Sequence, residues 1–334
     1  MGADRSRGIG VLRRVARSEA GATINGPRGG APSMEGTAVT VRVPATSANI
    51  GTGFDCLGLA LDLFASVTVT FSDAEQLPTN DVGEKMVLSA ARAAYERIGR
   101  PSPAGLTARY TVAIPLGRGL GASAVARVAG VLAVNEREGH PLDEDACLGL
   151  AAELEGHVDN ACPALFGGVQ ACVATEDGFA RVRCRYPSDL EIALLIPDHS
   201  MPTKEARRLL PDSYSRQDAI HTSSRLGLLV AALAAGRTDL LDEATQDRFH
   251  QQQRSALFPP LYDVFASAKG AGAHAAWLSG AGSSVAAFTP EESSRDVAKA
   301  MLDRLEAAGM SGRTLVTRIA ASGAEVSRVE MVDV

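Results

Sequence analysis

The sequence predicts a mixed α/β or α+β protein that forms one large domain or, as we expect, two ordinary ones. Its 334 residues are about twice the usual length of a domain. Apolar residues make up 46% of the chain and aromatic residues only 4%, which indicates a well-filled core of small side chains. Segments with strand-like alternation also lie between segments with helical spacing, as this mixed class requires.

The first half of the chain is expected to begin with two strands and a loop between them. Alternation predicts strands at residues 37–45 and 64–72. The intervening stretch contains ATSANIGTGFDCLGLAL, in which glycines and small polar residues interrupt two apolar runs. Neither a solvent loop nor a plain strand requires that composition. We therefore expect a tightly folded loop whose residues were selected for something other than packing.

The other elements of the first half follow from the hydrophobic period and from glycine or proline boundaries. We expect helices at residues 83–99, from residue 122 onward and at roughly 143–154, and strands within residues 105–117, 166–174 and 190–198. Strands and helices thus alternate up to the middle of the chain.

The pattern changes after Pro197, where helices become more frequent. Helices are expected at residues 204–210, 217–235 and 240–249; a helix, strand, glycine turn and strand within 261–290; and a last helix and strand within 292–309 and 313–320. We predict an N-terminal domain at residues 36–188 and a C-terminal domain at 189–334. Residues 1–35 are expected to be a disordered extension, or to precede a true start at Met34.

Charge, cysteines and hydropathy exclude several classes of protein. A formal net charge of -6 argues against nucleic-acid binding, for which a basic domain is the first footprint. No run reaches the ~18 apolar residues of a membrane helix. The five cysteines show no zinc-like spacing and are expected to be reduced thiols. We therefore expect a cytoplasmic protein that binds neither nucleic acid nor membrane.

The most informative segment is IPLGRGLGASAVARVAG, residues 114–130. A strand is expected to end near its start, and glycines at 117, 119 and 121 lead into an Ala-rich helix. Such a turn exposes backbone N–H groups at a helix N-terminus, which suits a polyphosphate, and Ser123 can ligate Mg²⁺ there. The pattern matches neither a Walker loop nor the dinucleotide fingerprint. Taken alone, it is equally compatible with a tight strand-to-helix turn.

Three further segments carry candidate functional groups. LEGHVDNACPALFGGVQ (residues 154–170) places an acid, an imidazole and an amide side by side, although a capped loop would use the same residues. MPTKEARRLLP (201–211) places Thr203 and Arg207 on one helix face, which can bind an anion or simply be solvated. DRFHQQQR (247–254) is equally ambiguous, and SGAGSSVAAF (279–288) reads as a second glycine turn or a hairpin connection.

Together, in this order and spacing, these segments resemble the GHMP small-molecule kinases. ATSANIGTGFDCLGLAL is similar to the family's first motif, IPLGRGLGASA to its ATP loop, and SGAGSS to its third motif. The resemblance covers about residues 38–320. It implies an α+β fold with an N-terminal domain like ribosomal protein S5 and a ferredoxin-like C-terminal domain, with the site between them.

The implied activity is transfer of the γ-phosphoryl group of ATP, with Mg²⁺, to a small-molecule hydroxyl. Within the family the motifs are most similar to those acting on the side-chain hydroxyl of L-homoserine, a step of threonine biosynthesis. A homodimer is one assembly that the resemblance allows. Two alternatives stay open: a kinase of another hydroxylated amino acid such as threonine in a specialised pathway, and a GHMP-fold binding protein without catalysis.

The resemblance also assigns roles to residues. The expected catalytic residues are Asn49, Asn160, Ser123 and Glu155, with Ser123 and Glu155 as the metal ligands. The expected ATP-binding residues are Pro115, Leu116, Gly117, Arg118, Gly119, Leu120, Gly121, Ala122, Ser123, Ala124 and Val125. The expected acceptor-binding residues are Asn49, Asp55, His157, Asp159, Asn160, Thr203, Arg207 and Arg254, with the two arginines as carboxylate clamps and Asp55 for the ammonium group.

Several residues depart from the family pattern. Ala122 replaces the first of two serines, and Arg127 stands where an apolar residue is usual. A charge at position 127 must reach a phosphate, a carboxylate or solvent, because an unpaired buried guanidinium would be costly. Thr52 and Val158 each replace a usual proline. These changes indicate either drift or a related acceptor.

Overall fold

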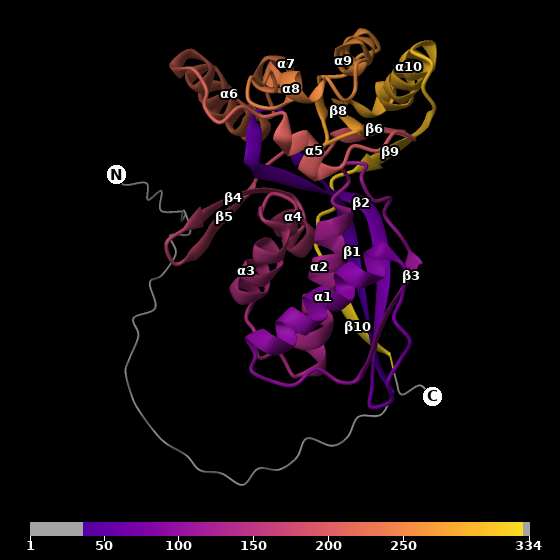
Figure 1. Ribbon diagram of the computed structural model, residues 1–334. Helices are drawn as coiled ribbons and strands as arrows, with labels where there is room; N and C mark the ends of the chain where they lie inside the picture. The colour runs from indigo at the N-terminus through magenta and orange to yellow at the C-terminus, as the bar shows by residue number, and fades with distance from the viewer. Residues whose placement is uncertain (1–35, 330–334) are drawn as a thin grey trace, which may run out of the picture. The chain divides into compact units, whose positions relative to one another are not determined.

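The computed structural model describes residues 36–329, so the predicted extension at residues 1–35 lies outside it. The described chain contains two antiparallel sheets (Figure 1). The first has six strands in the order β10-β1-β2-β4-β5, with β3 also paired to β2. The second has four strands in the order β7-β8-β6-β9. Within residues 36–329, no helix is both long and apolar enough to cross a membrane.

The strands of the first sheet are β1 (Thr37–Asn49), β2 (Gly53–Ser72), β3 (Gly105–Val112), β4 (Val169–Thr175), β5 (Gly178–Cys184) and β10 (Glu325–Val329). Those of the second are β6 (Glu191–Pro197), β7 (Ala275–Leu278), β8 (Val285–Thr289) and β9 (Gly312–Arg318). The predicted boundary at residue 188 falls in the connection between the two sheets, although β10 returns to pair with β1. That boundary stays a prediction.

The helices of the first part are α1 (Val82–Arg97), α2 (Ala122–Arg137), α3 (Glu144–Glu155) and α4 (Ala161–Phe166). They lie together beside the first sheet in Figure 1. The later ones are α5 (Thr203–Arg208), α6 (Arg216–Ala235), η1 (Thr238–Leu240), α7 (Leu241–Ala244), α8 (Gln251–Arg254), α9 (Leu261–Gly270), η2 (Glu291–Ser293) and α10 (Ser294–Ala307). Of these, α9 and α10 pack on the second sheet.

Period-2 alternation decides which side of each strand is buried in which core. Val39, Val41 and Val43 of β1 are fully buried, whereas Arg42 between them is exposed. Strand β6 is buried on both faces. Its Ile192 and Leu194 belong to the large core shared with the first sheet, and Leu195 to the smaller core under α9 and α10. The apolar run of β6 follows from this double burial.

Most predicted elements are present, with some differences. The stretch expected to be a long loop is mostly strand, because β1 runs to Asn49 and β2 begins at Gly53, leaving a turn of residues 50–52. The helix expected at residues 240–249 ends at Ala244. Four short elements, α4, β5, α8 and β10, were not predicted. All five cysteines are free thiols, as expected.

Candidate active site

A cavity of about 240 Å³ brings the predicted site residues together. All predicted acceptor-binding and metal-binding residues line it: Asn49, Asp55, Ser123, Glu155, His157, Asp159, Asn160, Thr203, Arg207 and Arg254. So do Pro115, Leu116, Gly117, Gly119, Leu120, Gly121 and Ala122 of the predicted ATP loop, whereas Arg118, Ala124 and Val125 do not. Six lining residues were not predicted: Val82, Met86, Met201, Pro202, Gly280 and Ala281.

The loop before α2 is shaped by glycines in the left-handed region. Gly117, Gly119 and Gly121 have φ of 66°, 70° and 68°. The N-cap of α2 is Gly121, so no side chain accepts from the N–H groups of the first turn. Those N–H groups and the helix dipole therefore favour an anion at this end of the cavity.

The third glycine segment fixes the position of this loop. The Ser279 hydroxyl donates to the carbonyl of Gly119 at 2.6 Å, and the backbone N–H of Ser284 donates to that of Arg118 at 3.1 Å. A Cβ added at Gly119 would lie 2.0 Å from the Ser279 carbonyl oxygen. SGAGSS is thus neither an isolated hairpin nor a remote loop, because it packs directly against the first glycine loop.

Glu155 closes α3 next to the first turn of α2. Its carboxylate accepts one hydrogen bond from the Ser123 hydroxyl and another from Arg127 Nε, the latter at 2.6 Å. Only 7% of the Glu155 side chain and 20% of the Arg127 side chain are exposed. The unusual charge at position 127 therefore reaches a carboxylate. This contact holds one carboxylate oxygen and leaves the other facing Ser123.

The Ser123 and Glu155 side chains fit a magnesium ion better than a metal that is bound by protein ligands alone. Among residues 36–329 no three His, Cys, Asp or Glu side chains gather to hold a metal. Mg²⁺, however, typically takes one or two carboxylates, keeps several waters and shares substrate phosphates. One carboxylate and one hydroxyl beside an anion-favouring helix end make a suitable donor set.

His157, Asp159 and Asn160 form a chain of polar contacts across the cavity floor. His157 Nδ1 lies 2.6 Å from Asp159 Oδ1, and the Asn160 amide donates to the same oxygen at 3.3 Å. Burial alone would lower the pKa of His157, but the hydrogen bond and charge of Asp159, with Glu155, raise it overall. The side-chain oxygen of Asn160, Oδ1, in turn accepts from the Thr46 hydroxyl at 2.7 Å. These two hydrogen bonds hold the side-chain amide of Asn160 in one orientation, and an amide carries no charge.

The turn after β1 is a run of left-handed residues. Asn49, Ile50 and Gly51 have φ of 70°, 42° and 72°, and Asp55 has φ of 58°. Asn49 Nδ2 donates to the Gly280 carbonyl at 2.9 Å, and Asn49 Oδ1 accepts from the Asp55 backbone N–H at 3.1 Å. The small and polar residues of this segment thus fix a strained turn that presents Asn49 and Asp55 to the cavity.

The two predicted arginine clamps are not equivalent. Arg207 donates two hydrogen bonds to Asp55, at 2.7 and 3.0 Å, so part of its guanidinium is already paired with a carboxylate. Arg254 is only 2% exposed and forms no ion pair with any residue that the structure describes. Burial and then the charge of Arg207 lower the pKa of Arg254 to about 10. An uncompensated buried cation favours an anionic ligand.

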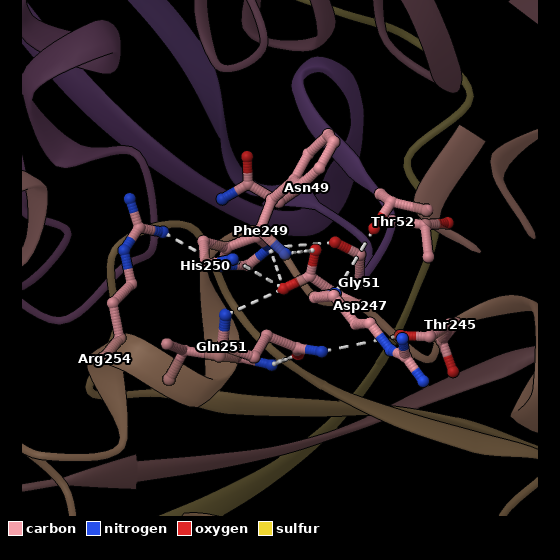
Figure 2. A network of polar contacts seen from close by, with 12 residues as sticks. Asn49, Gly51, Thr52, Thr245, Asp247, Phe249, His250, Gln251 and Arg254 are labelled. Atoms are coloured by element: carbon pink, nitrogen blue, oxygen red, sulfur yellow. Dashed lines mark hydrogen bonds and ion pairs between the residues drawn. The ribbon is translucent and has the colours of Figure 1, made fainter. Parts of the chain in front are cut away.

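Sequence reasoning missed the network behind Arg254 (Figure 2). Asp247 accepts from the backbone N–H groups of Phe249, His250 and Gln251 at 2.7, 2.7 and 2.8 Å. His250 is fully buried between Arg254 and the carbonyl of Gly51. The segment DRFHQQQR contained a signal, because an aspartate side chain commonly accepts from backbone N–H groups a few residues on in a turn, but only its arginine was singled out.

His250 should make stability depend on pH. Burial lowers its pKa to about 4, below the 6.5 of an unburied imidazole, against the opposing charge of Asp247. Between these values the unfolded chain binds more protons than the folded one, so stability falls on acidification. From pH 7 to pH 5, urea unfolding should show His250→Asn losing about 2 kcal/mol less than the unaltered chain. Equal losses in both proteins would contradict this.

The sequence matches the family described as "GHMP kinases N terminal domain" over residues 85–168 and "GHMP kinases C terminal" over residues 229–312. It is 42% identical over 305 residues to the homoserine kinase of Deinococcus radiodurans, covering 87% of this chain and 97% of that protein. It is 38% identical over 303 residues to the homoserine kinase of Synechococcus sp., covering 87% of this chain and 98% of that one.

The comparison with solved structures also finds a homoserine kinase. The crystal structure of homoserine kinase from Cytophaga hutchinsonii matches with a TM-score of 0.78 and 31% identity, over 87% of this chain and 97% of that chain. Mevalonate diphosphate decarboxylase from Staphylococcus aureus matches with a TM-score of 0.63 at 17% identity, over 87% of this chain and 98% of that chain, which shows a shared fold only.

Proposed function

This chain belongs to the homoserine kinases of the GHMP kinase family, and on that basis we propose that its cavity transfers the γ-phosphoryl group of ATP to the side-chain hydroxyl of L-homoserine. The product is O-phospho-L-homoserine, an intermediate of threonine biosynthesis. One observation carries the site assignment: a buried arginine without a carboxylate partner among the described residues lines the same cavity as an uncapped helix N-terminus. One end thus favours a phosphate and the other a carboxylate.

The nucleotide is proposed to lie along the glycine loop. Its phosphates would accept from the N–H groups at the start of α2, while Ser123 and one oxygen of Glu155 hold Mg²⁺. When bound, this ion neutralises charge on the transferring phosphoryl group. A second cavity of about 270 Å³ shares Leu116 and Ala122 with the first and is lined by Ile114, Tyr110 and Val125. Its apolar residues could pack on the adenine ring, and Asp81 and Glu84, which also line it, could accept hydrogen bonds from the amino group of the ring.

The acceptor is proposed to be oriented by its two charged groups. The carboxylate would lie on Arg254, and the ammonium group on Asp55, whose carboxylate has lone pairs beyond those taken by Arg207. This places the hydroxyl-bearing end toward Asn49 and Asn160 at the base of the glycine loop. Both amides are fixed by hydrogen bonds within the protein, so they can orient the hydroxyl without moving.

In this arrangement catalysis rests on positioning and charge stabilisation. The hydroxyl oxygen bonds to the γ-phosphorus as the bond to the β–γ bridging oxygen breaks. Asn160 is not basic, and Asp159 already accepts from His157 and Asn160. A strong base is dispensable because phosphoryl transfer proceeds through a loose transition state, in which the hydroxyl loses its proton late, to an oxygen of the transferred phosphoryl group or to solvent. The chain's own contribution is an in-line alignment next to the N-terminus of α2.

Most departures from the family pattern lie outside the cavity. The Thr52 hydroxyl donates to the Ala244 carbonyl at 2.9 Å, and Val158 is buried in the core. Only Ala122, which keeps Ser123 beside it, lines the cavity. This supports drift rather than a changed acceptor. The free thiols likewise support the proposed cytoplasmic location.

The test is ADP release by the purified chain with Mg-ATP and one acceptor at a time: L-homoserine, L-threonine, L-serine or mevalonate. We expect a kcat/KM for L-homoserine well above those of the other three. Preference for another hydroxy amino acid would contradict the proposed acceptor but retain the kinase. Absence of turnover with every acceptor would leave a binding protein.

Replacing Arg207 by methionine should chiefly weaken acceptor binding. Asp55 would lose its two charged hydrogen bonds and move from the position that receives the ammonium group. We expect the KM for L-homoserine to rise about tenfold or more, since a charge-assisted hydrogen bond contributes about 1.5–3 kcal/mol. The KM for ATP should stay within about twofold. The neighbouring Arg208→Met is the control, and an unchanged acceptor KM in Arg207→Met would contradict this role.

A further inference from the structure

Arg254 is held by one nitrogen only. Its Nη1 lies 2.9 Å from the carbonyl oxygen of Gly280 and 3.2 Å from His250 Nδ1. Both hydrogens of Nη1 are therefore used. Nε is buried without a hydrogen-bond partner among the described residues. Nη2 forms no hydrogen bond with a described residue either, so it is the nitrogen left to donate to a carboxylate in the cavity, provided that the guanidinium plane does not rotate.

His250 has the tautomer needed to prevent that rotation. Its Nε2 lies 2.8 Å from the carbonyl oxygen of Gly51, which can only accept, so Nε2 carries the proton. In the neutral ring Nδ1 is then an acceptor and receives a hydrogen from Arg254. Burial supports the neutral form, since it lowers the pKa of His250 to about 4 even though Asp247 faces the ring.

The same ring connects Arg254 with the turn that carries the other acceptor residues. Gly51 lies in the left-handed turn between Asn49 and Asp55, and a Cβ there would sit 2.2 Å from the Thr245 carbonyl oxygen. The His250 ring also stacks on Phe54, with centroids 5.1 Å apart. Figure 2 shows His250 between Arg254 and Gly51, with the Asp247 carboxylate accepting from the His250 backbone N–H.

We propose that His250 is a positioning residue. It fixes the guanidinium plane of Arg254 and the distance of Arg254 from the Asn49–Asp55 turn. It thereby sets the spacing between the carboxylate site and the ammonium site for the acceptor. This inference rests on the proposed function. The competing explanation is that His250 only stabilises the fold. In that case its loss would lower stability and disturb nucleotide and acceptor binding alike.

Two substitutions separate the two contacts of the ring. In His250→Gln the side-chain amide lies near the former Nε2 and can still donate to Gly51, but nothing replaces the Nδ1 acceptor. In His250→Asn the amide oxygen lies near the former Nδ1 and can still accept from Arg254, but the bond to Gly51 is lost. We expect His250→Gln to raise the KM for L-homoserine about tenfold, corresponding to about 1.4 kcal/mol, with a smaller rise in His250→Asn.

In both variants, kcat at saturating L-homoserine and the KM for ATP should stay within about twofold, because the glycine loop does not contact His250. A double-mutant cycle with Arg254→Met gives an independent measurement. Once Arg254 is absent, His250→Gln should have little further effect on kcat/KM for L-homoserine. Additive losses in the cycle would overturn the positioning role, as would parallel changes in the KM for ATP and in kcat.

The unaltered chain is assayed first, which separates this inference from the function on which it rests. No turnover of L-homoserine would overturn the proposed function and the inference together. Turnover with an unchanged acceptor KM in His250→Gln would overturn the inference alone. Retained binding in His250→Asn with loss in His250→Gln is the pattern that supports it.

Discussion

Replacing Glu155 by glutamine is expected to lower kcat by about 100- to 1,000-fold at saturating Mg²⁺ and both substrates, the loss typical of removing one preorganised electrostatic contact. Glutamine keeps the size of the side chain but removes the negative charge that faces Ser123. The proposed magnesium site would then retain a hydroxyl and the substrate phosphates only. Initial rates across a Mg²⁺ titration are the measurement, and near-normal turnover at saturation would contradict the assignment.

Two further variants control for damage to the fold. Glu155→Gln leaves Arg127 without its partner, and breaking such a pair can destabilise a protein. The double variant Glu155→Gln with Arg127→Met removes both charges, so it should recover stability in urea unfolding without recovering activity. Glu153→Gln, two residues earlier in α3, breaks only an exposed pair with Arg97 and should keep full activity.

Replacing Gly119 by alanine should reduce kcat/KM for ATP about 100-fold, the loss expected when a reacting group is displaced by about 1 Å. The new Cβ would lie 2.0 Å from the Ser279 carbonyl oxygen and 3.0 Å from the backbone nitrogen of Gly282. Because these are backbone atoms, the glycine loop must move away from the turn that supports it. Its left-handed conformation adds about 1–2 kcal/mol of strain for any residue with a side chain.

Gly139→Ala is the control that separates the backbone strain of a left-handed alanine from the steric clash of its Cβ. Gly139 has φ of 80°, but no atom lies within 4 Å of an added Cβ. This variant should be destabilised by about 1 kcal/mol and keep the activity of the unaltered chain. Calorimetric measurement of ATP binding, beside kcat/KM, then shows whether Gly119→Ala acts on the glycine loop. Equal ATP affinity in both variants would falsify the role assigned to the contact with Ser279.

Local pattern was a good guide to the long elements and a poor one to the short ones. The period of residues 83–99 predicted α1 within two residues, because its apolar face and its aspartate cap are all local. The helix expected at residues 240–249 ends at Ala244, and the Asp247 carboxylate accepts from backbone N–H groups of the turn that leads into α8. Strand β10 could not be recognised from its five residues, since its stability comes from pairing with β1, nearly 300 residues earlier in the chain.

For the site, the sequence by itself determined a set of residues that the fold gathers at one cavity. The three glycine segments, the acidic cluster before α4 and the two arginines all line it, and their chemistry predicts phosphate, cation and amino-acid partners. What the sequence could not determine is which of these groups are paired with each other. That Asp55 pairs with Arg207, Arg127 with Glu155, and Asn160 with Thr46 depends on contacts between distant segments.

Only the tertiary structure therefore showed that, of the two arginines at the cavity, Arg254 is the one without a carboxylate partner among the described residues, and that His250 contacts it. Residue type and spacing specify local conformation, because a glycine's freedom or a helix period acts over a few residues. The pairing of buried charges depends instead on which groups the fold brings within hydrogen-bond distance, and that is decided by the packing of the whole core.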